Sequence, residues 1–148
     1  MPNESIKNAI RERFDEEELI NYMVFSLITN NYDGFSQNWQ WITYDSKKWT
    51  IVPYDCDLTF GYNEEGSNLW PASQSSKKYD YRMSNADMNG PMKWIRTYFW
   101  NEVKQRYAHL RDQKIIDTDN ILKLFQSWTD RIGNKNYTEE WNKWQNSP

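Results

Sequence analysis

Two short alternating segments joined by a polar turn constrain the fold of this chain more than any other feature of its sequence. Residues 38–43 place aromatic and threonine side chains on one side and Gln40 and Ile42 on the other, and residues 49–54 are rich in β-branched and aromatic side chains. Between them, residues 44–48 (Tyr-Asp-Ser-Lys-Lys) are typical of a turn. We therefore predict a β-hairpin, whose two ends lie close together because antiparallel partners are only about 5 Å apart.

Acidic and amide side chains flank this predicted hairpin. Asp33 and Asn38 lie at the start of its first strand, and Asp55 and Asp57 follow its second strand. The hairpin would bring them together, and carboxylate and carboxamide oxygens are ligands that suit a hard divalent cation. Asp33 and Asn38 are also separated by four residues. This is the spacing of the catalytic loop of protein kinases, in which the Asp accepts the proton of the attacking hydroxyl and the Asn holds a metal ion.

The segment after the second strand carries a further element of a kinase site. Protein kinases place a metal-holding Asp, followed by Phe and Gly, after a strand, and this chain has Asp55, Asp57, Phe60 and Gly61 there. The D-x-x-x-x-N spacing alone is common by chance, whereas its combination with a hairpin and D-x-D-x-x-F-G is more specific. The sequence does not rank Asp55 and Asp57 as metal ligands.

Residues 30–61 resemble the core of the CotH kinase family, the atypical protein kinases related to spore coat protein H. Members of this family have a helix that ends in an Asn- or Asp-rich loop, then Asn-Trp, and then a W-x-hydrophobic-P-[WY]-D-x-D-x-[ST]-[FW]-G segment. This chain has WTIVPYDCDLTFG over residues 49–61. A looser resemblance continues through residues 102–111 and 136–144, so that it extends over most of the chain.

The resemblance implies a transferase that moves phosphate from ATP to Ser or Thr hydroxyls of a protein substrate. It implies that Asp33 orients and deprotonates the acceptor hydroxyl, and that Asn38, Asp55 and Asp57 hold Mg²⁺ or Mn²⁺ with ATP. It assigns no further cofactor-binding residue. The family also implies an extracellular, cell-surface or coat-associated location, whereas neither the compartment nor the oligomeric state follows from the residues themselves.

Outside the hairpin the sequence predicts helices, which gives a mainly helical α+β fold. Residues 19–28 are apolar on nearly all sides, as expected for a buried helix. In the kinase-like C-terminal lobe that the family implies, such a helix leads into the catalytic loop. Gly34 is expected to allow a sharp turn after it. Residues 63–90 have no clear period, and we interpret them either as a loop like the activation segment of kinases or as a variable insertion. The further helices are expected within residues 3–14, 91–99, 100–111 and 118–132, with a last short helix capped by Thr138.

We expect residues 1–148 to form a single domain. A complete two-lobed kinase needs roughly twice this length, and the first 30 residues contain no Gly-rich loop and no strand lysine with a partnering glutamate. From the resemblance we therefore expect the chain to correspond to the C-terminal lobe of a CotH-like domain without its N-terminal lobe. Alone, it is expected to bind ATP poorly and to have impaired activity.

Composition excludes several other classes of function. The net charge of −3 is unlike the basic footprint of a nucleic-acid-binding protein, and no apolar run is long enough to span a membrane. Residues 1–8 have no apolar core typical of a signal peptide. Cys56 is the only cysteine and His109 the only histidine, which argues against a disulfide, a zinc site and Cys-His or Ser-His-Asp catalysis.

Three alternatives remain open from the sequence. The chain could be a non-catalytic binding module of the coat or adhesin type, or a carbohydrate-active enzyme with two carboxylates such as Asp33 and Asp55 and with aromatic sugar platforms. The acidic residues could also be purely structural, as turn and strand caps or as partners of Arg96 and Arg106. The resemblance to the CotH family favours the kinase interpretation.

Overall fold

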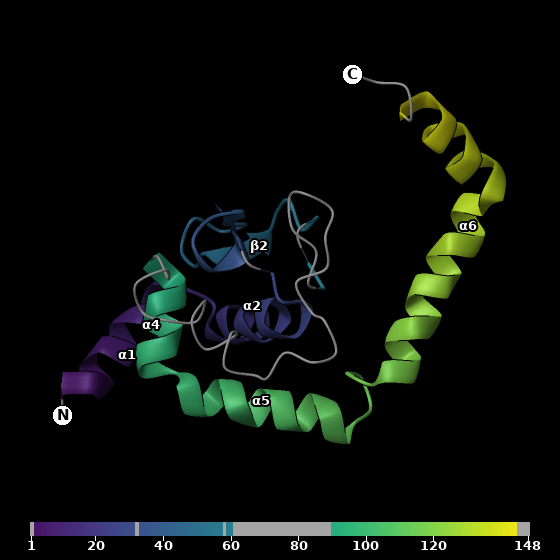
Figure 1. The fold of residues 1–148 in the computed structure, drawn as a ribbon. Coiled ribbons are helices and arrows are strands. Elements are labelled where there is room, and N and C mark those ends of the chain that lie inside the picture. The colour runs from purple at the N-terminus through teal and green to yellow at the C-terminus, as the bar shows by residue number, and fades with distance from the viewer. Residues whose placement is uncertain (1, 32, 58, 61–89, 145–148) are drawn as a thin grey trace. The chain divides into compact units, whose positions relative to one another are not determined.

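The computed structural model describes residues 2–31, 33–57, 59–60 and 90–144 (Figure 1). The chain divides into two compact units, residues 1–107 and residues 108–148. The mainly helical α+β class predicted from the sequence is confirmed. The described elements, in chain order, are α1 (Pro2–Arg13), α2 (Glu16–Thr29), the 3-10 helix η1 (Asp33–Phe35), β1 (Trp39–Ile42), β2 (Thr50–Pro53), α4 (Gly90–Tyr98), α5 (Trp100–Asp112) and α6 (Thr118–Trp144).

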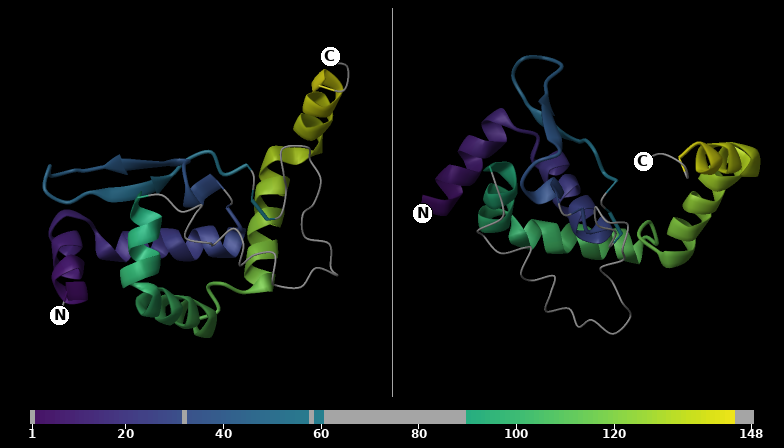
Figure 2. Two further views of the ribbon diagram at one scale, coloured as in Figure 1. Left: turned by 60° about the vertical axis from the view of Figure 1, so that its left-hand side comes forward. Right: turned by 45° about the horizontal axis from the view of Figure 1, so that its top comes forward.

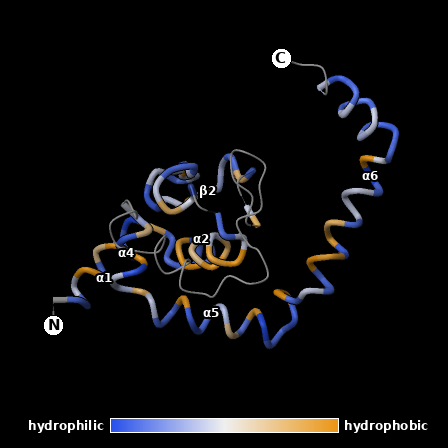
Figure 3. Tube along the Cα trace, in the orientation of Figure 1, coloured by the Kyte–Doolittle hydropathy of each residue, from blue (hydrophilic) through white to orange (hydrophobic). Residues whose placement is uncertain are grey.

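Helix α2 is the buried centre of the first unit, as its sequence predicts. The Asp15 carboxylate caps its start by accepting a hydrogen bond from the backbone N–H of Glu18 at 3.2 Å. The helix ends at Asn30, which adopts the left-handed conformation (φ 50°) that Asn tolerates better than most residues. Figure 3 shows apolar residues concentrated along this helix. Its buried side chains are Leu19, Ile20, Tyr22, Met23, Val24, Ser26 and Thr29.

The predicted hairpin is also confirmed. Strands β1 and β2 are antiparallel, with Trp39 opposite Pro53 and Ile42 opposite Thr50. The hairpin is attached to the connection between α1 and α2, because Asp15 N–H donates to the Trp49 carbonyl at 2.8 Å and Trp49 N–H donates to the Arg13 carbonyl at 2.9 Å.

The rest of the first unit packs around α2. Helix α2 contacts both β2 and α4, and the hairpin runs alongside α2 (Figure 2). An ion pair between Lys7 Nζ and Glu102 Oε1 at 2.5 Å links α1 to α5. The apolar side chains that α4, α5 and the residue between them bury are Pro91, Met92, Ile95, Phe99 and Val103. The hairpin therefore packs through β2 against a helical core.

The second unit contains α6, which Gly133 interrupts (φ 75°, ψ 149°). The predicted helix stop at Gly133 is therefore confirmed, but the predicted cap at Thr138 is wrong. Helical backbone resumes at Asn134, and the Thr138 hydroxyl donates to the Asn134 carbonyl at 2.9 Å as an interior helix residue. Most of the apolar side chains of α6 are exposed in this unit, among them Leu122, Phe125 and Trp128.

The predicted loop of residues 63–90 falls almost entirely on residues that the structure does not describe. Residues 63–89 of the predicted loop lie outside the described residues, and Gly90 already belongs to α4. Among the helices that the structure describes, none has the length and apolar character needed to cross a membrane.

Candidate functional site

Asp33 begins η1, four positions after Thr29, the last residue of α2. The turn is closed by two hydrogen bonds to the Asp33 carbonyl, from Ser36 N–H at 3.1 Å and from Gln37 N–H at 2.7 Å. Phe35 anchors the same turn, with only 3% of its surface exposed. The Asp33 side chain is half-buried. Local packing thus holds the carboxylate at the start of a short, anchored turn.

Asn38 joins the two ends of the hairpin. Its Nδ2 donates to Asp33 Oδ2 at 3.4 Å and to the Asp55 carbonyl at 3.3 Å, while Tyr54 N–H donates to the Asn38 carbonyl at 2.9 Å. Asn38 has a positive φ of 60°, which Asn adopts more readily than most residues. The structure therefore brings Asp33, Asn38 and Asp55 into one neighbourhood, as the hairpin predicts.

Asp55 and Asp57 complete the acidic cluster, which we define as Asp33, Asn38, Asp55 and Asp57. Both Asp55 and Asp57 are exposed. The negative charge of Asp57 raises the pKa of Asp55 above its ordinary value, with further contributions from burial, from a hydrogen bond with Asp57 and from the charge of Asp33. The carboxylates are thus close enough to repel one another, and a cation would relieve this repulsion.

The chemistry of the cluster fits a magnesium-type site that shares its ion with a ligand. Among the described residues, no three acidic, His or Cys side chains are arranged to hold a metal ion by themselves. Mg²⁺ in nucleotide sites is usually held by one or two carboxylates together with phosphate oxygens and water. Carboxylates and the Asn38 carboxamide are ligands of this kind, and the phosphates of a nucleotide would supply the rest.

The two arginines that the sequence suggested as partners of these carboxylates, Arg96 and Arg106, have contacts with other residues. Arg106 Nε donates to Asn21 Oδ1 at 2.9 Å, and its Nη2 lies 3.8 Å from Glu17 Oε1. The Arg96 guanidinium lies over the Trp100 ring, 3.8 Å from its centroid. The hydrogen bonds from Asn38 to Asp33 and to the Asp55 carbonyl show that Asn38 also has a structural role, because they hold the open end of the hairpin together. This role is compatible with a cation site formed by the same residues.

A second set of residues, Tyr22, Asn31 and Gly34, lies next to the turn that carries Asp33. The sequence did not indicate these contacts. Asn31 is 1% exposed, and its Oδ1 accepts a hydrogen bond from Gly34 N–H at 3.2 Å. The Tyr22 hydroxyl donates to the Gly34 carbonyl at 3.2 Å, and burial raises the pKa of Tyr22 to about 12, which keeps this donor protonated. The pattern Asn-x-Asp-Gly is visible in the sequence, but its contacts are not.

Gly34 is required for a reason other than the one the sequence suggested. Gly34 lies in the tight turn of η1, as expected, but its φ is not in the positive region, unlike those of Gly90 and Gly133. A Cβ at this position would instead lie 2.6 Å from Asn31 Nδ2 and 3.0 Å from the Tyr22 hydroxyl. Glycine is needed because the chain passes close to these two buried side chains.

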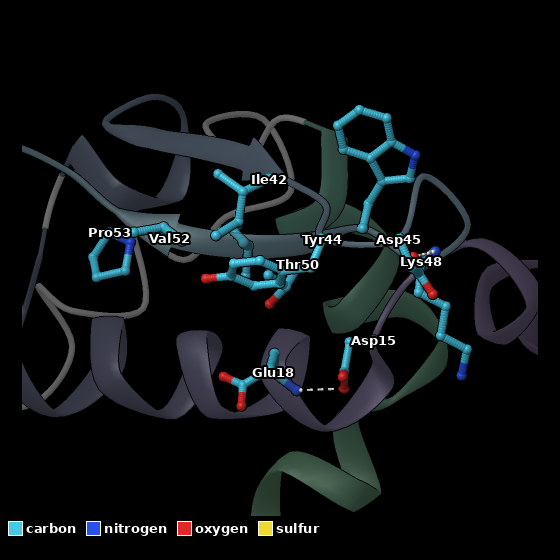
Figure 4. A pocket seen from close by; sticks show the side chains of 11 residues that line it. Asp15, Glu18, Ile42, Tyr44, Asp45, Lys48, Thr50, Val52 and Pro53 are labelled. Atoms are coloured by element: carbon cyan, nitrogen blue, oxygen red, sulfur yellow. Dashed lines mark hydrogen bonds between the residues drawn. The ribbon is translucent and has the colours of Figure 1, made fainter.

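An open pocket of about 690 Å³ lies between the hairpin and the first half of α2 (Figure 4). Its charged lining residues include Glu18 and Lys48, whereas the carboxylates of Asp15 and Asp45 cap the start of α2 and the hairpin turn. None of the four residues of the acidic cluster lines it. The pocket is therefore distinct from the candidate site.

The raised pKa of Asp55 leads to a prediction about stability and pH. The folded chain binds a proton at Asp55 more tightly than the unfolded chain, whose carboxyl has the ordinary pKa of 3.8. Stability should therefore fall as pH rises from 3.8 through the raised folded value, and the penalty persists at pH 7. We expect Asp55→Asn to raise the Tm at pH 7 without divalent cations, and to leave it unchanged below pH 3.8.

Asp45→Asn is the matched control, because Asp45 is also exposed but has the opposite shift. Backbone N–H groups of Lys48 and Lys47 lower the pKa of Asp45, so its carboxylate contributes stability above the ordinary pKa that is lost as pH falls through the folded one. Thermal unfolding followed by circular dichroism should show a lower Tm for Asp45→Asn at pH 7. A lower Tm for Asp55→Asn as well would contradict the repulsion within the acidic cluster.

Comparison with known proteins agrees with the residue pattern. The family model described as CotH kinase protein matches residues 1–148. No curated protein and no solved structure matches the chain. The match extends over the whole chain, including the hairpin and the four residues of the acidic cluster, and the chain therefore belongs to the CotH kinase family.

Proposed function

We propose that the acidic cluster is the catalytic site of a CotH-type protein kinase, which transfers phosphate from ATP to Ser or Thr hydroxyls of a protein. The observation that carries this proposal is the position of Asn38. Its carboxamide contacts both Asp33 and the Asp55 backbone, so that a candidate base before β1 and candidate metal ligands after β2 lie near one another at the open end of the hairpin. The family match supports a kinase-like function.

Each residue has a separate role in the proposal. Asp33 orients the acceptor hydroxyl and accepts its proton, while Asn38, Asp55 and Asp57 hold Mg²⁺ or Mn²⁺ with ATP. When bound, the cations neutralise charge on the phosphate groups. The anchored turn of η1 keeps Asp33 in place, and positioning of this kind provides much of the rate enhancement in phosphoryl transfer.

The fold of the first unit supports a finer assignment. We infer that α2, η1 and the hairpin correspond to the C-terminal lobe of a kinase-like fold. Helix α2 buries seven of its 14 residues and ends at Thr29, four positions before Asp33. In this assignment the hairpin places the metal ligands at its open end, next to the candidate base.

Calorimetric titration of Mn²⁺ with ATP into the chain tests the proposal. The double variant Asp55→Ala, Asp57→Ala should lose at least about tenfold in affinity, because the affinity of such sites follows the number of charged ligands. A double variant Asp112→Ala, Asp130→Ala is the matched control, since it removes two exposed carboxylates outside the acidic cluster. It should bind like the unmodified chain.

Two outcomes would contradict the proposal. Equal affinity in both double variants would show that the cation binds elsewhere. No binding by the unmodified folded chain would show that this chain alone does not form the nucleotide site, either because the site needs the N-terminal lobe that the family implies or because the chain is a non-catalytic binding module. Repeating the titration with a longer protein that includes an N-terminal lobe separates the two explanations.

A further inference from the structure

Asn31 is a buried side chain that contacts the sequence neighbours of the acidic residues at both ends of the hairpin sequence. Its Oδ1 accepts a hydrogen bond from Gly34 N–H at 3.2 Å, and Gly34 directly follows Asp33. Its Nδ2 donates to Cys56 Sγ at 3.6 Å, and Cys56 lies between Asp55 and Asp57. The Asn31 carboxamide therefore connects the turn at Gly34 with Cys56, which lies 25 residues after Asn31 in the sequence.

The surroundings of Asn31 leave its side chain little freedom. It is 1% exposed, and its own N–H donates to the Ser26 carbonyl at 2.9 Å. Gly34 passes so close that a single added Cβ would lie 2.7 Å from Asn31 Cγ. A second connection runs beside it, since Phe60 N–H donates to the Thr29 carbonyl at 2.5 Å. The end of α2 thus holds the segment after β2 at two points.

We propose that Asn31 is a positioning residue of the candidate kinase site: its carboxamide fixes the turn that carries Asp33 against the segment that carries Asp55 and Asp57. The role in catalysis rests on the proposed function, whereas the mechanical connection rests on the contacts alone. Outer-shell residues that orient metal ligands are typically worth about 10- to 100-fold in affinity or activity. The same range is expected for Asn31.

The first experiment measures the connection without metal or nucleotide. Hydrogen exchange by NMR is compared for the Gly34 and Phe60 amides in the unmodified chain and in Asn31→Ala, each relative to the Met23 amide in the core. Both amides should exchange about three- to tenfold faster in the variant, the factor that corresponds to one ordinary hydrogen bond. Val103→Ala is the control for a general loss of stability, because Val103 is equally buried but lies on α5. Val103→Ala should leave the exchange rates of the Gly34 and Phe60 amides unchanged relative to that of the Met23 amide.

The second experiment measures the consequence for the site. Affinity for Mn²⁺ with ATP should fall about 10- to 100-fold in Asn31→Ala, while Val103→Ala should bind normally. Cys56→Ala removes the acceptor of the Asn31 Nδ2 hydrogen bond and should weaken binding, whereas Cys56→Ser keeps an acceptor and should preserve most of it.

The outcomes separate this inference from the proposed function. Faster exchange at Gly34 alone would make Asn31 a local turn residue and overturn the inference. Normal affinity in Asn31→Ala, with binding lost in Asp55→Ala, Asp57→Ala, would leave the function standing and also overturn the inference. If the unmodified chain does not bind Mn²⁺ with ATP, the proposed function fails for this chain. The exchange rates of the Gly34 and Phe60 amides then decide by themselves whether Asn31 connects the two segments. Asn31→Ser, which keeps a small polar group, is measured in parallel in case Asn31→Ala does not fold.

Discussion

Replacing Asp33 by Asn is expected to reduce kcat for phosphoryl transfer by about 10²- to 10⁴-fold, the usual contribution of a positioned acid or base. In the proposed site, Asp33 accepts the proton of the attacking hydroxyl, and a carboxamide is not basic enough to do so. The KM for the protein substrate should change little, because the variant has nearly the same size and can still accept the hydrogen bond from Asn38 Nδ2.

The measurement is transfer of labelled phosphate from ATP to a serine-containing protein, with kcat and KM determined separately. Asp45→Asn is the control, because it makes the same chemical change at the turn of the hairpin, away from the acidic cluster. It should leave kcat unchanged. A kcat for Asp33→Asn within about threefold of the unmodified chain would exclude Asp33 as the base, since even the weakest expected effect is about 10²-fold.

This variant also distinguishes the role of Asp33 from that of the metal ligands. If Asp33 acts as the base, Asp33→Asn should retain affinity for Mn²⁺ with ATP and lose activity. Asp55→Ala with Asp57→Ala should lose both. A loss of cation affinity in Asp33→Asn would instead make Asp33 a ligand, which the short distance between Asp33 Oδ2 and Asn38 Nδ2 (3.4 Å) also permits.

The parts of the fold that depend on local patterns could be predicted from the sequence. Residues 19–28 are apolar or aromatic except at Asn21 and Ser26, which predicts a buried helix because little of its surface is left for water, and α2 buries seven of its residues. Alternation in residues 38–43 and 49–54 predicts the hairpin, which then brings Asp33, Asn38 and Asp55 together. Here the local signal and the final packing agree.

The parts that the sequence did not predict depend on contacts between distant segments. Nothing in residues 31–34 indicates that Asn31 contacts Cys56 or that Gly34 leaves room for Asn31 and Tyr22. Thr138 fails for a different reason: its cap chemistry is favourable, but the helix has already resumed at Asn134, and a threonine inside a helix bonds back to the preceding turn. The presence of a threonine does not by itself show whether its hydroxyl caps a helix start or bonds back to the preceding helical turn.

Met23→Ala is expected to lower the free energy of unfolding by about 2–5 kcal/mol, the range for deleting a large buried side chain. Met23 is 0% exposed on the central helix of the first unit, so its loss leaves a cavity that the packed surroundings fill only in part. Urea unfolding should show a lower midpoint with an unchanged m value. Met23→Leu, which nearly conserves volume, should cost less than about 1.5 kcal/mol.

Leu122→Ala is the matched control, because Leu122 is also a large apolar helix residue but is 60% exposed on α6. It should change stability by no more than about 0.5 kcal/mol. A similarly small effect for Met23→Ala would mean that α2 is not the centre of the core. The proposed site depends on this point, since α2 carries Tyr22 and leads into Asn31 and Asp33. A loosened α2 should therefore reduce phosphoryl transfer as well, whereas Leu122→Ala should leave it intact.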